Sequence, residues 1–351
     1  MKIAFGPMVG LPSTDWVGKD IADFLVKNHE IIYFDSFHAN VETDVIFIIK
    51  LMPPLDWIIK LKKSNVKLIY IPVDHFYRPE ILIRDKVKVA CFDSIAVHNL
   101  RLGELLSPFA SEVFEIDHYL KYSVEKTNHY KKEGFILWIG HIEYIPPLLQ
   151  SISVKPFPHP IKLLVDLENI ETKRIFLQKI LAKNGLQFTL EKLDDDRYKL
   201  NGYILEQWSA VKQRNYLQLC KAAFDTKGDN FAHNLKPPTK AQKYIYNQIP
   251  FAIDEHAYAK SYFSERGLTI PSIEEHERWF SEEYFDEIKL FVESNILSQK
   301  LEYVANSYID IVNKTTIKPI KNSIINLILK NIYYKVSYLL RRLFSQLQFG
   351  S

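Results

Sequence analysis

Short apolar segments alternate with helical segments along most of this chain of 351 residues, and this alternation constrains the fold more than any other feature. The helical segment 16–28 carries Val17, Ile21 and Leu25 on one face, as a helix that covers a sheet does. Strands separated by such helices are typical of a parallel sheet covered on both faces. In the first half of the chain we expect strands at residues 2–5, 30–34, 45–49, 67–73, 94–98 and 113–116.

The alternation begins again after a polar, charged segment, NHYKKEG at 128–134. The apolar segment 135–139 opens the second series, which ends in a long helical region. We therefore predict an α/β protein with two Rossmann-like αβα domains, residues 1–130 and 131–313, and a tail of residues 314–351. Two such domains place a ligand-binding cleft between the carboxyl ends of their strands.

The composition is that of a folded protein in a reducing compartment. Apolar residues make up 47% of the chain, which is enough for large cores. The two cysteines, Cys91 and Cys220, lie far apart in apolar segments, which argues against a disulfide framework. The N-terminal segment lacks a signal-peptide pattern, and no uninterrupted apolar stretch is long enough to span a membrane. We therefore expect a cytoplasmic protein.

Several classes of site are disfavoured by the sequence. It contains no GxxxxGK[ST], HExxH, CxxC or GxSxG motif. The triplet DDD at 194–196 lies between two expected strands, so we predict a hairpin turn there and no metal site. Before Lys314 the chain has 38 basic and 42 acidic residues, and this slightly acidic body disfavours nucleic-acid binding.

The tail carries all of the excess positive charge, with seven basic residues and no acidic residue from Lys314 onward. Within 317–349, apolar residues recur at helical spacing between the charges. A basic amphipathic helix rich in aromatic residues lies readily on an anionic membrane surface. We expect such a helix to hold the chain at the inner face of the cell membrane. The alternative is a helix packed across the body or in an oligomer interface.

The strongest candidate site is the stretch 222–254. It predicts a strand at 222–225, a polar loop, and a helix over 239–247 that opens at Pro238 or Thr239. A helix N-terminus offers unpaired N–H groups and a partial positive charge, which suit a phosphate. An ordinary strand–loop–helix with solvated lysines is the alternative. The phosphate-binding candidates are Lys236, Lys240, Thr239, Asn230, His233 and, after the strand at 135–139, Gly140.

These features resemble the GT-B glycosyltransferases. The resemblance rests on the paired αβα domains, on WIGH at 138–141, on EQWS at 206–209 and above all on NLKPPTKAQKYIYNQIPFAI at 234–253. It implies a nucleotide-sugar donor as substrate, no separate cofactor, and phosphate contacts from Lys236 and Lys240. Many retaining members carry two glutamates in this region, whereas this chain has Lys240, Ala241 and Gln242, so donor nucleotide and stereochemistry stay open.

The expected function is transfer of a sugar from a nucleotide-sugar donor to a saccharide or lipid-linked saccharide acceptor, without a divalent metal ion. An inverting enzyme needs a general base near the acceptor hydroxyl. Asp15 is the first candidate, and Asp74 and His75 are the next; His98-Asn99 and Asp117-His118 also follow strands. In a retaining enzyme no such base is needed, and Asp15 only caps a helix. Two alternatives are a GT-B sugar-nucleotide epimerase and a non-catalytic GT-B-like membrane scaffold subunit.

Overall fold

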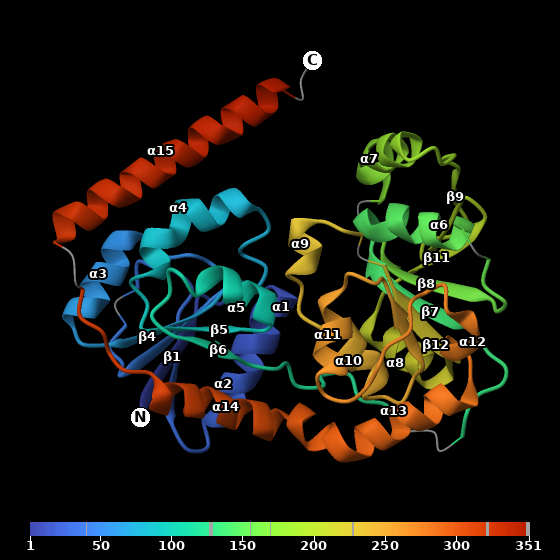
Figure 1. Ribbon diagram of the computed structural model, residues 1–351, viewed down its shortest axis with the longest axis horizontal. Helices are drawn as coiled ribbons and strands as arrows, with labels where there is room; N and C mark the ends of the chain where they lie inside the picture. Colours follow the sequence, from blue (N-terminus) through green and yellow to red (C-terminus); the bar gives the residue numbers. More distant parts are fainter. Residues whose placement is uncertain are drawn as a thin grey trace. The chain divides into compact units, whose positions relative to one another are not determined.

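The computed structural model describes residues 1–39, 41–125, 129–154, 156–168, 170–226, 228–320 and 323–348. The chain forms two compact units, each built around its own sheet (Figure 1). Unit 1 comprises Met1–Tyr119, Asn230–Pro237 and Leu297–Ser351, and unit 2 comprises Leu120–Asp229 and Pro238–Ile296. The predicted fold of two αβα domains is confirmed.

The units divide the chain differently from the predicted boundaries at 130 and 313. Unit 1 receives the segment Asn230–Pro237 from the middle of unit 2, and it also receives Leu297–Ser351. The reason is packing: α14 (Leu301–Lys314) buries Val304, Tyr308 and Ile311 in the core of unit 1. Sequence order alone had placed these residues in the second domain.

Unit 1 contains a parallel six-stranded sheet of order β2-β1-β3-β4-β5-β6. Its strands are β1 (Lys2–Gly6), β2 (Glu30–Tyr33), β3 (Val45–Ile49), β4 (Lys67–Ile71), β5 (Ser94–Val97) and β6 (Val113–Glu115). Its other helical segments are α1 (Pro12–Thr14), η1 (Asp15–Lys19), α2 (Asp20–Leu25), α3 (Leu55–Lys63), α4 (Pro79–Val89), α5 (Leu100–Leu106), α9 (Phe231–Asn234) and α15 (Ile324–Gln348), and η3 (Ile296–Gln299) precedes α14.

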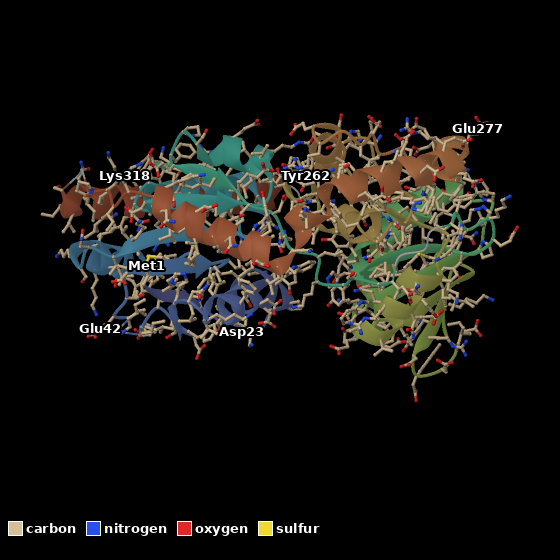
Figure 2. The ribbon with its side chains drawn as sticks, turned by 90° about the horizontal axis from the view of Figure 1, so that it is seen from below. Met1, Asp23, Glu42, Tyr262, Glu277 and Lys318 are labelled. Atoms are coloured by element: carbon tan, nitrogen blue, oxygen red, sulfur yellow. The ribbon has the colours of Figure 1, made fainter. Side chains whose placement is uncertain are left out.

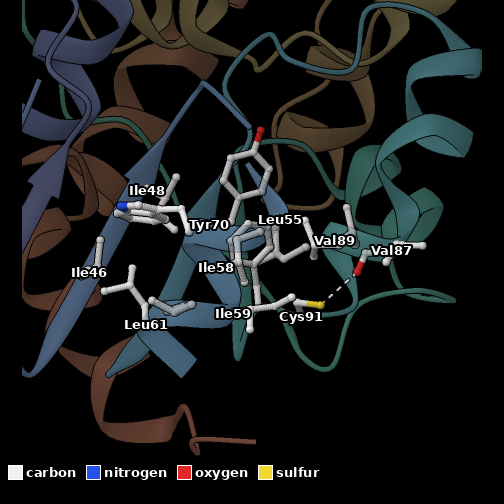
Figure 3. Packing of buried hydrophobic residues seen from close by; sticks show 14 of the residues in the cluster. Ile46, Ile48, Leu55, Ile58, Ile59, Leu61, Tyr70, Val87, Val89 and Cys91 are labelled. Carbon is white, nitrogen blue, oxygen red and sulfur yellow. Dashed lines mark hydrogen bonds between the residues drawn. The ribbon is translucent and has the colours of Figure 1, made fainter. Parts of the chain in front are cut away.

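Successive side chains of each strand enter opposite layers of unit 1, as the pleat of a strand requires. On β3, Ile46 and Ile48 join the core under α3 and α4, whereas Phe47 and Ile49 join the core under α2 and α14. Figure 3 shows the first of these cores, where Cys91 Sγ donates a hydrogen bond to the Val87 carbonyl at 3.2 Å. Both faces of the sheet are therefore covered.

A buried carboxylate ties three segments of unit 1 together. Asp93 pairs with Lys62 of α3 and accepts hydrogen bonds from Leu68 N at 2.8 Å and Lys318 N at 2.7 Å. Asp93 is fully buried. Lys318, labelled in Figure 2, lies between α14 and α15. The segment that leads into α15 is thus fastened to the core.

The helix α15 packs along α4 and touches α3 (Figure 1). Its inward residues include Leu327, which is buried, and Tyr334 and Tyr338, which are half-buried. Lys86 Nζ lies 4.2 Å from the ring centroid of Tyr334, and the Arg84 guanidinium lies 5.3 Å from that of Tyr338. None of the described helices is both long enough and apolar enough to span a membrane.

Unit 2 contains a seven-stranded sheet of order β13-β12-β7-β8-β11-β10-β9. Its strands are β7 (Ile136–His141), β8 (Ile161–Asp166), β9 (Leu190–Lys192), β10 (Arg197–Leu200), β11 (Tyr203–Gln207), β12 (Ala222–Asp225) and β13 (Phe251–Ile253). Its helical segments are η2 (Ile142–Tyr144), α6 (Ile145–Val154), α7 (Ile170–Lys183), α8 (Ala210–Leu219), α10 (Thr239–Ile245), α11 (Tyr258–Ser264), α12 (His276–Trp279) and α13 (Glu282–Asn295).

The sheet of unit 2 is parallel except around β10, which runs antiparallel to both of its neighbours. The DDD triplet forms the turn between β9 and β10, so the predicted hairpin is confirmed. Asp194 accepts from Arg197 Nε at 2.7 Å, and Asp195 and Asp196 pair with lysines. These aspartates are occupied by local ion pairs.

Candidate functional site

A hollow of about 50 Å³ lies at the carboxyl ends of β4 and β5 in unit 1. Carboxyl ends of parallel strands are where ligands bind in sheets of this class. The segment Asn230–Pro237 closes one side of the hollow, because Asn99 Nδ2 donates hydrogen bonds to the carbonyls of Asn234 and Lys236 at 3.2 and 2.9 Å. The polar and charged residues that line it are Asp74, Tyr77, His98, Asn99 and Lys236.

Asp74 is the charged centre of the hollow. Its Oδ1 accepts a hydrogen bond from Lys236 Nζ at 2.6 Å, and its Oδ2 lies 3.9 Å from Lys50 Nζ. Burial acts to raise the pKa of Asp74, but Lys236 and Lys50 outweigh burial and hold this pKa below its ordinary value. The carboxylate is therefore ionised at neutral pH and can accept a hydrogen bond from a hydroxyl group.

Lys50 and Asp74 both have left-handed backbone conformations, with φ of 63° and 54°. Such conformations cost energy for residues other than glycine, and they concentrate at functional sites. Lys50 directly follows β3, and Asp74 lies three residues after the end of the neighbouring strand β4. The strained turns bring their side chains together at one edge of the sheet.

Two histidines in ring contact extend this site. The rings of His98 and His118 lie 4.0 Å apart, and among the described residues no hydrogen-bond partner reaches His98 Nε2 or His118 Nδ1. Burial lowers the pKa of His98 well below its ordinary value and that of His118 to about 4, so both rings are neutral at pH 7. A neutral ring that lines a polar hollow can accept or donate a hydrogen bond to a ligand.

The other predicted bases lie apart from this hollow. His75 Nε2 lies 2.9 Å from Asp85 Oδ2, which also binds Arg84. Burial acts to raise the pKa of Asp85, but hydrogen bonds from His75 and Arg84 lower it to about 2. Asp15 is the first residue of the short π-helical segment η1 and is half-buried. The cap position of that segment is Thr14, whose side chain makes no capping hydrogen bond. Of the three candidates, Asp74 alone lines the hollow.

The predicted phosphate ligands Asn230 and His233 support α9. The Asn230 Oδ1 accepts a hydrogen bond from the His233 backbone N–H at 3.0 Å, and its Nδ2 lies 2.8 Å from His233 Nδ1. Asn230 therefore caps this short helix of unit 1. Together with Lys236 they belong to the segment that packs beside Asp74.

In unit 2, Lys240 is the cation at the carboxyl edge of the sheet. Its Nζ lies 2.8 Å from Oδ1 of the buried Asp225, the last residue of β12. The same Nζ lies 5.3 Å from the ring centroid of Trp138 and 6.0 Å from that of Tyr144. Lys240 follows Thr239, the first residue of α10, and this helix ends at Ile245, two residues earlier than predicted.

Gly140 has a packing role beside this cation. A Cβ atom at Gly140 would lie 2.3 Å from the Trp138 ring, so only glycine lets the indole lie across the end of β7. This contact positions the ring that Lys240 faces. Sequence reasoning named Asp225 only as the start of the candidate stretch 225–240, and it did not assign Trp138 or Lys50 to the site, because a buried tryptophan and a single lysine carry no distinctive motif.

The predicted phosphate-binding set is thus divided between the units. Lys236, Asn230 and His233 belong to unit 1, and Lys240, Thr239 and Gly140 belong to unit 2. Within the described ranges, no group of three or more His, Cys, Asp or Glu residues is placed to hold a metal ion.

Comparison with known proteins gives structural matches only. No protein-family model matches the sequence, and no curated protein matches it. A glycosyltransferase from Rickettsia africae ESF-5 is similar with a TM-score of 0.58 and 8% identity, over 90% of this chain and 99% of that chain. AviGT4, a glycosyltransferase involved in avilamycin A biosynthesis, is similar with a TM-score of 0.54 and 9% identity, over 90% and 98%.

These two structures decide the fold. This chain has the GT-B fold of glycosyltransferases. A chain of the GtfA/B complex also matches, with a TM-score of 0.49 and 9% identity over 78% of this chain. This chain covers 58% of that one, so it spans little more than half of its length. The fold that the sequence resemblance implied is therefore confirmed.

Proposed function

We propose that this GT-B chain is a glycosyltransferase that moves a sugar from a nucleotide-sugar donor to a saccharide or lipid-linked saccharide acceptor, in surface polysaccharide or glycolipid assembly. The observation that carries the proposal is the GT-B fold with a cation, Lys240, at the carboxyl edge of the unit 2 sheet. In open α/β sheets this edge is where nucleotides bind.

On the donor side, Lys240 supplies positive charge to the departing diphosphate. It is placed in the first turn of α10, beside N–H groups that the helix does not use internally. Thr239 and Lys236 remain predicted phosphate ligands. Fixed cations and N–H groups stabilise the charge that develops as the sugar leaves. In this scheme they do so without a divalent ion, and unchanged turnover in EDTA is the expected result.

On the acceptor side, Asp74 is the general base that the geometry of unit 1 favours. It is ionised, it lines a hollow, and its backbone is strained. An acceptor hydroxyl hydrogen-bonded to Asp74 would give up its proton as it attacks the donor sugar. His98 is neutral and lines the same hollow, so it would orient that hydroxyl. This role applies to an inverting reaction, and a retaining reaction needs no such base.

We also propose that the chain is peripheral to the inner face of the cell membrane, held there by its basic C-terminal tail. This location would bring a lipid-linked acceptor within reach of the site.

The deciding experiment is a calorimetric titration with UDP-, GDP-, ADP-, dTDP- and CMP-sugars, followed by product analysis. A transferase binds one donor class and releases the nucleotide (a nucleoside diphosphate, or CMP from a CMP-sugar) faster when acceptor is present. Conversion of the donor sugar without acceptor would instead identify an epimerase. Absence of binding to all of these donors would leave a scaffold subunit and refute the proposal.

A further inference from the structure

The helix α15 exposes a continuous apolar surface. We call this surface the outer face. Its side chains are between 49% and 72% exposed, although all are large and apolar. Soluble proteins rarely expose a contiguous apolar surface unless it binds a partner. The outer face consists of Ile325, Leu329, Ile332, Val336, Leu339 and Leu340.

The outer face lies opposite the side that packs on unit 1. The packed side is formed by Leu327, Asn331, Tyr334 and Tyr338, at spacings of four, three and four residues. The outer face has the same helical spacing, shifted by about half a turn. The apolar residues of α15 therefore serve two surfaces, and only one of these surfaces is covered by α4 and α3. Figure 1 shows α15 on the outside of unit 1 with α4 on its inner side.

The charges of α15 lie on its flanks. Lys330, Lys335, Arg341 and Arg342 fall between the packed side and the outer face, and the helix has no acidic residue. Such side chains can keep their apolar stems beside lipid while their charged groups reach the headgroups. An apolar ridge between two basic flanks is the arrangement of a helix that lies in a membrane surface.

The C-terminal part of α15 adds a basic hollow. Arg341, Arg342 and Arg78 line a hollow of about 350 Å³, to which Glu80 contributes one carboxylate. Three guanidinium groups against one carboxylate leave this hollow positively charged. Arginine binds phosphate oxygens through paired N–H groups. Lipid phosphates therefore fit the chemistry at this end of the helix.

We propose that the outer face of α15 docks on an anionic lipid surface, with its apolar side chains among the acyl chains and its basic flanks against lipid phosphates. The inference rests on the membrane association proposed above, and it names the face and the lipid class. A second copy of the chain is the competing occupant. Pairing two such helices through their outer faces would bring like basic flanks together, whereas anionic lipid neutralises them.

The test is flotation of the full chain with vesicles of pure phosphatidylcholine or of phosphatidylcholine with phosphatidylglycerol. The wild-type chain should float with the anionic vesicles only, and high salt should reduce its binding. The variant Leu329→Asp/Val336→Asp should lower partitioning on the order of 100-fold, since it removes two exposed apolar side chains that docking would bury in lipid. Arg341→Gln/Arg342→Gln should lower it about 30-fold, from the loss of two charges.

Matched controls come from unit 2. Leu290→Asp/Val211→Asp makes the same two substitutions at exposed positions of α13 and α8, and should bind like wild type. Lys179→Gln/Lys183→Gln removes two charges from α7 and should bind within about twofold of wild type. Circular dichroism should show that each variant is folded, because the substituted side chains are exposed.

Three results would overturn the inference. Wild-type binding that survives Leu329→Asp/Val336→Asp would show that another surface docks, although the membrane association would stand. Absence of wild-type binding to anionic vesicles would refute both the docking of the outer face and the proposed membrane association. A wild-type dimer that this variant dissociates, without vesicle binding, would identify a second copy as the occupant. Transfer to a soluble acceptor should be unchanged in the variant, so the proposed activity is tested separately.

Discussion

The substitution Lys240→Met in unit 2 tests whether Lys240 binds a nucleotide, stabilises the fold, or does both. Lys240 Nζ lies 2.8 Å from Asp225 Oδ1 and 5.3 Å from the centroid of the Trp138 ring. Methionine keeps the length of the side chain and its contact with the indole, but it removes the charge. We expect two measurable losses, one in stability and one in nucleotide binding.

The loss in stability comes from Asp225, whose side chain is 1% exposed, whereas that of Lys240 is 25% exposed. Removing one partner of a buried ion pair costs about 3–5 kcal/mol. Because Lys240 is partly exposed and Asp225 has a further interaction, we expect about 2–3 kcal/mol, measured by urea denaturation. Losing a charged contact to phosphate costs about 1.5–3 kcal/mol, which is roughly 10- to 150-fold in the dissociation constant of the nucleoside diphosphate.

The double variant Asp225→Asn/Lys240→Met distinguishes the two roles. A buried amide does not need a cation, so most of the stability should return, whereas binding should stay weak. Lys243→Met is the control on the same helix, since Lys243 Nζ donates to the neutral Gln213 Oε1 at 3.1 Å. If the double variant is as stable as wild type and binds the nucleoside diphosphate equally well in calorimetry, Lys240 serves only to neutralise Asp225.

Three further predictions concern unit 1. Asp74→Asn should lower transfer by an inverting enzyme about 100-fold or more without weakening donor binding, whereas the reverse ranking with Asp15→Asn would make Asp15 the base. Asp93→Asn should lower the free energy of unfolding by about 3 kcal/mol in urea, because it leaves a buried lysine without its carboxylate. Burial lowers the pKa of His118 to about 4, so the unfolded chain binds a proton first as pH falls from about 6.5. Unfolding free energy should therefore decrease from pH 6.5 to 4, and His118→Gln should reduce that slope.

The sequence predicted which segments are strands and helices better than it predicted which of the two units each segment joins. Buried strands such as β3 were recognisable because apolar residues, most of them β-branched, run without interruption. The periodicity of α14 shows that one face is buried, but not which sheet it covers. Lys236 and Lys240 are one helical turn apart in sequence, yet they pair with carboxylates in different units. No local sequence pattern shows that these two lysines belong to different units.

The candidate site was predicted where chemistry coincides with a strand end. Asp74 was chosen as a candidate base because the expected strand 67–73 ends at this carboxylate, and Asp74 lines the hollow of unit 1, three residues after the observed end of β4. Lys50 was not identified, since a lysine after a strand is common and its left-handed backbone is invisible in sequence. The tail was predicted as a single amphipathic face, whereas α15 carries apolar residues on two opposite sides. Residue spacing alone could not show that α4 covers one of them.

The return of the chain to unit 1 sets an order for folding during synthesis. Unit 2 is complete once residue Ile296 has emerged from the ribosome, but one layer of unit 1 is still missing then. Residues 304–312 of α14 must be translated before the sheet that begins with β1 is covered on both faces. The hydrogen bond from Lys318 N to Asp93 forms later still, because Lys318 follows α14 in the chain. The first strands to be made therefore belong to the last unit to be finished, and the nascent chain keeps an apolar face of unit 1 exposed until its C-terminal helices are translated.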